Sequence, residues 1–332
     1  MATQQDFDRV PIPHPGTGSP INHLFDEQSR WAILAALAAN RPLLVRGDPG
    51  VGKSQLAHAA AIALKRPFLS LVVNARTESQ DLLYAFDAVS RLAKAQICSA
   101  IMGGSEKEEK AKDRELQDLL AESNFVNPGK LWWAFNWETA STQAKKVGAP
   151  HETAPGKWKS GDGCVLLIDE IDKAESDVPN GLLEALGSHS FPVRGCEKPI
   201  AVTGQPPLVV ITTNEDRVLP NAFVRRCLVL HIELPEGEKL KKLLLERGVA
   251  HQPDMDQIHL AAAADELIQA RNAQKHVRPR PGQAEYLDLI RAMNQLVKDE
   301  QRKPKGEIKL TEKQILDNVK GFVLKKNAGS PV

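Results

Sequence analysis

Short apolar segments alternate with helical stretches over the first two thirds of the chain. Each apolar segment is three to six residues long, as expected of a strand that is buried on both faces of a sheet. The segments span residues 43–45, 68–73, 165–168, 208–212 and 228–232. Helical patterns mark residues 24–40, 54–65, 81–100 and 178–186, and a hairpin is expected at 191–203. This alternation predicts an α/β fold with a doubly wound, mainly parallel sheet covered by helices on both faces.

The last third of the chain has only helical patterns. Four such stretches cover residues 236–247, 255–272, 284–298 and 312–325. They predict a separate small α-helical domain that begins after Pro235. Residues 1–20 are rich in proline and glycine, which predicts an extended lead-in. The expected organisation is a lead-in (1–20), an α/β domain (21–235) and a C-terminal helical domain (236–332).

A glycine-rich loop follows the first strand candidate and matches the pattern G-x-x-x-x-G-K-[ST] in full. Its residues, with the next one in the chain, are Gly47, Asp48, Pro49, Gly50, Val51, Gly52, Lys53, Ser54 and Gln55. The glycines let successive backbone N–H groups point at one anion, and the helix that follows adds the positive end of its dipole. Lys53 is a compact cation for the β- and γ-phosphates, and the hydroxyl of Ser54 can coordinate Mg²⁺. These nine residues are therefore expected to bind a nucleoside triphosphate.

Two carboxylates follow the apolar segment 165–168. A buried parallel strand would deliver Asp169 to the carboxyl edge of the sheet, where open α/β sheets bind ligands. Asp169 can hold Mg²⁺ there, and Glu170 can polarise the water that attacks the γ-phosphate. An apolar strand before Asp-Glu is alone a weak signal, but downstream of a phosphate loop the catalytic interpretation is favoured.

The distance between the two motifs predicts an insertion. Ser54 and Asp169 are 115 residues apart, about twice what the intervening helices and strand need. Residues 103–161 are the natural candidate for the inserted segment. This segment has an aromatic cluster that could pack inside the protein or against a partner, and we expect internal packing because aromatic side chains are usually core. The cluster consists of Trp132, Trp133, Phe135 and Trp137.

Polar residues near the last two strand candidates are further site candidates. If the strand 208–212 lies beside the Asp169 strand, Asn214 can reach the attacking water or the γ-phosphate. Arg225 and Arg226 follow shortly afterwards. Such arginines usually solvate a helix end, but an arginine can also reach the nucleotide of a neighbouring subunit and stabilise its transition state.

Composition narrows the class of protein. The 332 residues carry 43 lysines and arginines against 42 acidic residues, a formal charge of +1, which argues against a surface that binds nucleic acid by charge alone. The longest apolar run, residues 31–39, is about half of what spans a bilayer. The four cysteines are widely spaced, which argues against a disulfide framework or a zinc knuckle. With no secretory signal at the N-terminus, we expect a cytoplasmic protein that is not bound to a membrane.

The four motifs in this order, followed by a helical tail, resemble the AAA+ ATPase family. Finer features are similar to its MoxR-like branch: the segments 76–83, 168–174 and 219–223, and the insertion near the second helix. The resemblance implies a doubly wound nucleotide-binding domain with a helical lid. It places sensor 1 at Asn214, the arginine finger at Arg226 with Arg225 as second choice, and sensor 2 at Arg280 or Arg278. It also makes Asn74 a candidate switch residue.

Taken together, the sequence predicts an Mg²⁺-dependent ATPase with the roles given above. The resemblance implies that the enzyme forms a homo-oligomeric ring of six subunits and remodels or matures a partner protein, its client or effector. The alternative is a nucleic-acid motor or loader with DNA-stimulated hydrolysis, because the AAA+ family includes many and residues 302–326 hold several lysines. A small-molecule kinase fits less well, because the glutamate beside Asp169 and the pair of arginines favour water as the phosphoryl acceptor. A GTPase fits less well, because no N-K-x-D segment follows the third strand.

Overall fold

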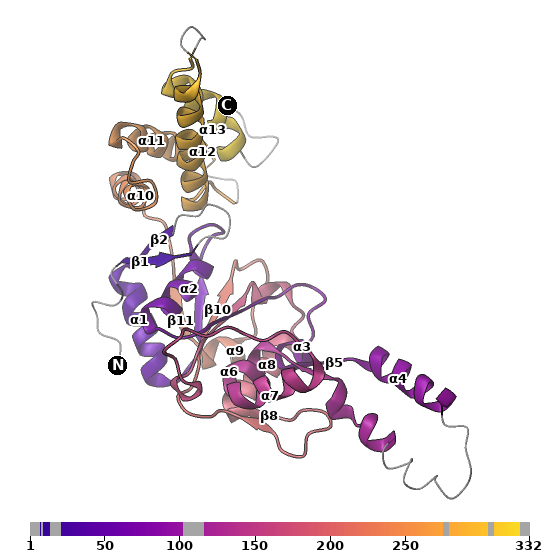
Figure 1. Ribbon diagram of the computed structural model, residues 1–332. Helices are drawn as coiled ribbons and strands as arrows, with labels where there is room; N and C mark the ends of the chain where they lie inside the picture. The colour runs from indigo at the N-terminus through magenta and orange to yellow at the C-terminus, as the bar shows by residue number, and fades with distance from the viewer. Residues whose placement is uncertain are drawn as a thin grey trace, which may run out of the picture. The chain divides into compact units, whose positions relative to one another are not determined.

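The computed structural model describes residues 7, 9–13, 21–101, 116–274, 279–304 and 309–325 (Figure 1). The chain divides into two compact units. The first unit comprises Met1–Ala32, Val45–Ala63 and Leu230–Val332, and the second comprises Ile33–Leu44 and Leu64–Val229. The first therefore contains the glycine-rich loop and the C-terminal helices, and the second contains the two carboxylates after the apolar strand.

A five-stranded sheet forms the centre of the fold, in the order β11-β3-β10-β7-β4. Its strands are β3 (Leu43–Arg46), β4 (Phe68–Val72), β7 (Val165–Asp169), β10 (Leu208–Thr213) and β11 (Leu228–His231). β7 pairs in parallel with both β4 and β10, so that Val165 lies opposite Phe68 on one side and Leu208 on the other. The five predicted strands and the α/β class are confirmed.

The helices of the second unit depart in two places from the predicted pattern. The helix expected over residues 81–100 is confirmed only in part: residues 79–83 and 88–101 are helical, but Tyr84–Phe86 between them form a short strand, β5, that pairs with β6 (Val126–Pro128). Within the expected insertion, residues 137–147 form a helix that the sequence pattern did not predict. α1 (Glu27–Ala39) has residues in both units. The other helices of the second unit are α3 (Ser79–Leu83), α4 (Ala88–Ile101), α6 (Lys130–Phe135), α7 (Trp137–Val147), α8 (Asp177–Ser188) and α9 (Asn221–Arg226). The expected hairpin is present as β8 (Ser190–Phe191) and β9 (Ile200–Ala201).

The aromatic cluster is part of the core of the second unit. Trp132, Trp133 and Phe135 of α6 are buried, and the ring centroids of Trp133 and Trp137 are 5.1 Å apart in an edge-to-face arrangement. The expected internal packing of the cluster is confirmed. Residues 102–115, which include the start of the expected insertion, lie outside the described residues.

The first unit combines a hairpin, one helix after the glycine-rich loop, and four C-terminal helices. β1 (Arg9–Ile12) pairs antiparallel with β2 (Ile21–Leu24), so part of the expected lead-in is a strand. The helices are α2 (Lys53–Leu64), α10 (Gly237–His251), α11 (Gln257–Ala273), α12 (Gln283–Arg302) and α13 (Glu312–Leu324). The C-terminal four, which match the four predicted stretches, share an apolar core around Leu244, Leu260 and Ile290. The domain boundary at Pro235 stays a prediction. Among the described helices, none is long and apolar enough to cross a membrane.

Candidate functional site

The glycine-rich loop of the first unit connects the end of β3 at Arg46 to the start of α2 at Lys53. Three of its residues have backbone angles that favour glycine: φ is +150° at Gly47, +79° at Gly50 and +99° at Gly52. A Cβ atom at Gly47 would lie 2.3 Å from the carbonyl oxygen of Ile232. The loop therefore needs glycine for both its curvature and its packing.

Lys53 is held inside this loop. Its side chain is 7% exposed, and Nζ donates hydrogen bonds to the carbonyl oxygens of Gly47 (2.7 Å) and Asp48 (3.0 Å). Ser54 and Gln55 follow in the first turn of α2 and are half-buried. Three left-handed glycines around a buried ammonium group, at the N-terminus of a twelve-residue helix, fit a phosphate group.

The start of α12 lies against the loop within the same unit. The backbone N–H of Ala284 donates to the carbonyl oxygen of Gly50 at 3.1 Å. Arg280, three residues before α12, pairs with Glu236 at 3.8 Å. Arg280, the first candidate for sensor 2, thus lies just before the helix whose first turn contacts the loop. Arg278, the other candidate, lies outside the described residues.

Arg271 is a further cation in this region that the sequence analysis missed. It is buried, and its guanidinium donates to the carbonyl oxygen of Pro281 at 2.5 Å. Burial lowers the pKa of Arg271, and nearby Arg280 lowers it further, while Asp48 and other carboxylates oppose the shift. Arg271 therefore fixes the segment that carries Arg280.

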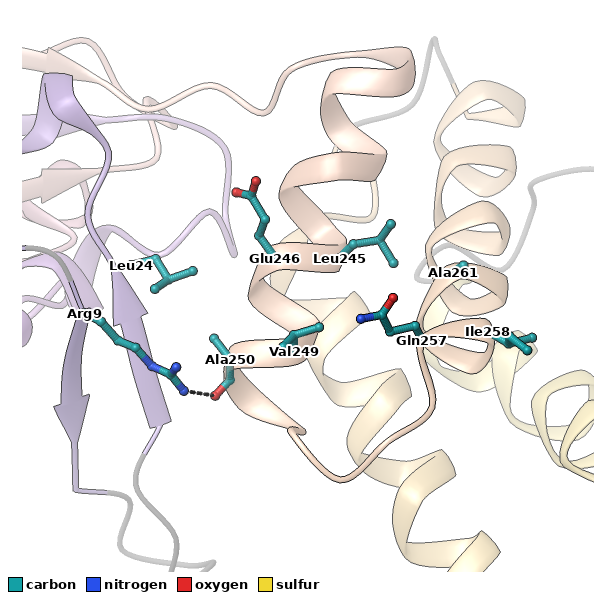
Figure 2. A pocket seen from close by; sticks show the side chains of 9 residues that line it. All are labelled: Arg9, Leu24, Leu245, Glu246, Val249, Ala250, Gln257, Ile258 and Ala261. Carbon is teal, nitrogen blue, oxygen red and sulfur yellow. Dashed lines mark hydrogen bonds between the residues drawn. The ribbon is translucent and has the colours of Figure 1, made fainter.

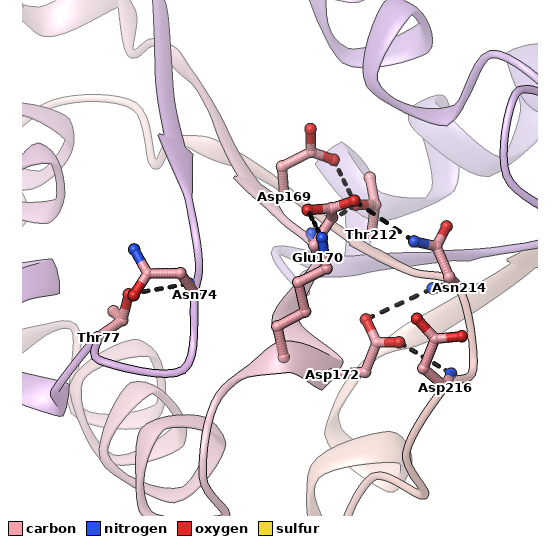
Figure 3. Close-up of polar contacts among 9 residues, drawn as sticks. Asn74, Thr77, Asp169, Glu170, Asp172, Thr212, Asn214 and Asp216 are labelled. Atoms are coloured by element: carbon pink, nitrogen blue, oxygen red, sulfur yellow. Dashed lines mark hydrogen bonds and ion pairs between the residues drawn. The ribbon is translucent and has the colours of Figure 1, made fainter.

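In the second unit, one threonine forms hydrogen bonds with both acidic residues at the end of β7 (Figure 3). The hydroxyl of Thr212, on the adjacent strand β10, donates to Oδ1 of Asp169 at 2.5 Å and accepts from the backbone N–H of Glu170 at 2.9 Å. Thr212 is fully buried. Glu170 has φ +60° and ψ +47°, a left-handed conformation that is strained for a residue with a side chain. The hydrogen bond from its N–H to Thr212 helps to hold it there.

The carboxylate of Glu170 has partners on both oxygens. Asn214 Nδ2 donates to Oε1 at 3.4 Å, and Lys173 Nζ donates to Oε2 at 2.5 Å. The hydrogen bond to Glu170 is the main cause that raises the pKa of Lys173. Asp172 is also buried and accepts from the backbone N–H groups of Asn214 (3.4 Å) and Asp216 (2.9 Å). The structure therefore brings Asp169, Glu170 and Asn214 together, with the adjacency of β7 and β10 that the sequence analysis required.

Asn74, the candidate switch residue, bonds within its own turn. Its Oδ1 accepts from the backbone N–H of Arg76 at 2.8 Å, and its backbone N–H donates to the hydroxyl of Thr77 at 3.0 Å. Figure 3 shows this turn apart from Glu170. The switch role of Asn74 stays a prediction.

Arg225 and Arg226 form the last turn of α9, and both residues are exposed. Both lie in the second unit, as do Asp169 and Glu170. Their role towards a neighbouring subunit stays a prediction.

A cavity of about 680 Å³ in the first unit has a different character (Figure 2). It lies between the β1–β2 hairpin and the helices α10 and α11, and its lining is mostly apolar, with Leu24, Leu245 and Val249 among the residues. Arg9 donates to the carbonyl oxygen of Ala250 at 3.4 Å beside it. None of the predicted phosphate-binding or catalytic residues lines this cavity.

A parallel sheet with a phosphate loop after one strand and paired acids after another defines the class of P-loop nucleotide hydrolases. The family model of the AAA domain, dynein-related subfamily, matches residues 42–227. The chain belongs to this family and, as a member, is an ATP hydrolase.

The chain is also similar to several solved structures. A variant of RuvB from Thermotoga maritima has 14% identity and a TM-score of 0.46, with 88% of this chain and 67% of that chain covered. The T. maritima RuvB Holliday junction branch migration motor has 14% identity and a TM-score of 0.45, with 88% of this chain and 66% of that chain covered. A candidate ATPase from Cytophaga hutchinsonii has 14% identity and a TM-score of 0.37, with 89% of this chain and 79% of that chain covered. The chain thus spans about two thirds of the length of the RuvB chains. No curated protein matches it.

Proposed function

We propose that the protein is an Mg²⁺-dependent AAA+ ATPase of the MoxR-like branch, which assembles into a ring of six subunits and remodels or matures a partner protein. The observation that carries the proposal is the cluster of Asp169, Glu170 and Asn214 at the ends of two adjacent parallel strands, joined through the buried hydroxyl of Thr212. Such a cluster provides one carboxylate, Asp169, that can bind a metal, a second, Glu170, that can activate water, and an amide, Asn214, that can contact the water or the γ-phosphate.

The residues act on ATP as follows. The N–H groups of the loop and the ammonium group of Lys53 bind the phosphates, and Lys53 exchanges its two loop carbonyls for phosphate oxygens. Ser54 and Asp169 would hold Mg²⁺, which would neutralise phosphate charge. Glu170 accepts a proton from the attacking water.

Two further polar residues complete this site. Asn214 orients the water or the γ-phosphate, and Arg280 of the C-terminal helical region contacts the phosphates from the lid. Both roles follow from the resemblance to the AAA+ family, and the hydrogen bond between Asn214 and Glu170 supports the first of them.

The ring follows from the arginines. Arg226, or in second place Arg225, completes the site of the neighbouring subunit, where an arginine supplied in trans raises the rate by about 10³–10⁵. A head-to-tail contact repeated around an axis closes into a ring, so a shared site implies an oligomer. Hydrolysis then moves the lid relative to the α/β core and changes the shape of the ring.

The first experiment compares Glu170→Gln with Lys53→Ala. Glu170→Gln removes the base but keeps the volume of the side chain, so it should bind ATP with unchanged affinity and lose turnover. Lys53→Ala should lose ATP affinity. Hydrolysis at the wild-type rate by Glu170→Gln would refute the assignment of the base.

The second experiment identifies the client. Glu170→Gln protein held in ATP should retain a partner protein that wild-type protein with ADP does not retain. DNA-stimulated hydrolysis with a steep dependence on salt would instead favour the nucleic-acid motor. The cytoplasmic location expected from the sequence stays a prediction.

A further inference from the structure

Arg41 caps the helix that carries the two candidate finger arginines. It lies in the connection between α1 and β3, and its guanidinium donates to three consecutive backbone carbonyls at the end of α9. Nε donates to the carbonyl oxygen of Arg226 at 3.1 Å, and the Nη2 group donates to those of Cys227 (3.4 Å) and Arg225. All of these residues belong to the second unit.

α9 needs such a cap. The last four carbonyls of a helix have no partner within it, and a helix of six residues has little stability of its own. A cation at this end also complements the helix dipole. Arg41 supplies both the donors and the charge at the turn that contains Arg225 and Arg226.

Two other contacts fix the same region. Phe223, in the middle of α9, is fully buried in the core of the second unit. The backbone N–H of Leu228 donates to the carbonyl oxygen of Pro42, next to Arg41, at 2.8 Å. The backbone of α9 is thus held on one side by Phe223 and at its end by the 41–42 segment, while the side chains of Arg225 and Arg226 remain exposed.

We propose that Arg41 is a positioning residue for the arginine that each subunit presents to its neighbour. Arg41 binds the backbone of α9 and leaves the side chains of the finger arginines free to reach across the ring contact. Although Arg41 is only six residues before Gly47 in the chain, its effect on hydrolysis is then exerted in the neighbouring subunit. This inference rests on the proposed function, since it requires a shared site.

An arginine suits this position better than a lysine. The planar guanidinium fork donates in several directions at once, whereas an ammonium group on a flexible chain is a point charge. Arg41→Lys should therefore retain part of the cap, and Arg41→Ala should remove it. A displacement of a catalytic group by about 1 Å can cost about 100-fold in rate, so we expect turnover to fall about 10- to 100-fold in Arg41→Ala and less in Arg41→Lys.

The test measures ATP hydrolysis by rings that mix Arg41→Ala subunits with subunits of a second variant. Glu170→Gln subunits keep the finger but lack the base, and Arg226→Ala subunits keep the base but lack the finger. An equal mixture of these two should regain about a quarter of the wild-type rate, because half of the subunits have a base and half of those face an intact arginine. Arg41→Ala should behave like Arg226→Ala: it regains activity with Glu170→Gln and regains none with Arg226→Ala.

Each outcome decides between the claims. If Arg226→Ala is rescued by Glu170→Gln but Arg41→Ala is not, Arg41 acts within its own subunit and the inference is wrong. If Arg226→Ala itself is not rescued, the shared site of the proposed function fails, and the inference with it. Arg41→Lys is tested in the same mixtures, so that poor folding of Arg41→Ala does not leave the question open. Arg194→Ala, which removes an exposed arginine paired with Glu122 in the same unit, is the matched control and should keep wild-type turnover.

Discussion

The hydroxyl of Thr212 should be needed for catalysis because it positions Asp169 and Glu170. Thr212→Val keeps the shape of the side chain and removes only the hydroxyl. The backbone N–H of Glu170 then has lost its acceptor, and Oδ1 of Asp169 has lost a donor. Glu170 is held at φ +60° partly by this bond, so the variant should let its backbone and carboxylate move.

The magnitudes follow from the two bonds. An unsatisfied buried donor costs about 1–3 kcal/mol and a hydrogen bond to a charged group contributes about 1.5–3 kcal/mol, which together make about 2.5–6 kcal/mol. Both hydrogen bonds are only partly buried, so the free energy of unfolding should fall by an amount at the lower end of this range, about 2.5–4 kcal/mol. Turnover should fall about 10- to 100-fold, because catalytic geometry is that sensitive to small displacements.

The neighbouring residue provides a matched control. Thr213 is also buried on β10, but its hydroxyl accepts from the backbone N–H of Glu215 at 2.9 Å. Thr213→Val should cost about 0.5–1.5 kcal/mol in stability and change turnover little. Thr212→Ser, which keeps the hydroxyl, should restore most of the activity. Urea unfolding and steady-state ATP hydrolysis measure the two effects. Equal turnover in Thr212→Val and Thr213→Val would refute the role of Thr212.

Three further predictions concern other residues. Lys53→Ala should lose at least tenfold in ATP affinity measured by calorimetry, because the loop loses its one cation for the phosphates; unchanged affinity would contradict the phosphate-loop assignment. Lys173→Met should change the free energy of unfolding by less than about 1 kcal/mol, since the ion pair of Lys173 with Glu170 is partly exposed. This pair must break before Glu170 reaches the water, so Lys173→Met should raise turnover by up to about fivefold. Lys173→Arg keeps the pair and should not raise turnover. Burial lowers the pKa of His23 to about 4, with Arg247 adding to the shift, so this histidine is neutral when folded. Its contribution to stability is present above about pH 6.5 and is lost as the pH falls towards 4, by about 2 kcal/mol at pH 5; urea unfolding of His23→Gln should show a flatter dependence on pH, and an equal slope would contradict this.

The parts of the fold that follow local periodicity could be predicted from the sequence. The five strands could be predicted because each is a short continuous run of apolar residues, and the four C-terminal helices because their apolar residues repeat with the helical period. The glycine-rich loop could be predicted because its backbone requires glycine at positions such as Gly47.

The errors occurred where distant segments decide the structure. Residues 84–86 fit a helical pattern but pair with residues 126–128, some 40 positions away, and this pairing is not visible locally. α7 was missed because its buried face consists mainly of Ala140, Gln143 and Ala144, which gives a weak apolar pattern.

The same limit applies to the site. Asp169 and Glu170 could be predicted from the strand that precedes them, and the sequence places Thr212 only at the end of another strand. Its role depends on the parallel pairing of β10 with β7, which brings the hydroxyl to both acids. The sequence signal for a buried hydroxyl at this edge was the pair of adjacent threonines, Thr212 and Thr213, at the end of the strand.

The central claim is that the glycine-rich loop and the paired acids act on one ATP. A crystal structure of Glu170→Gln with ATP and Mg²⁺ tests it most directly. We predict that Lys53 leaves the carbonyl oxygens of Gly47 and Asp48 and contacts the γ-phosphate, with Asp169 at the metal and residue 170 facing a water in line with that phosphate. ATP bound elsewhere, or Lys53 still bonded to the two carbonyls, would contradict the account.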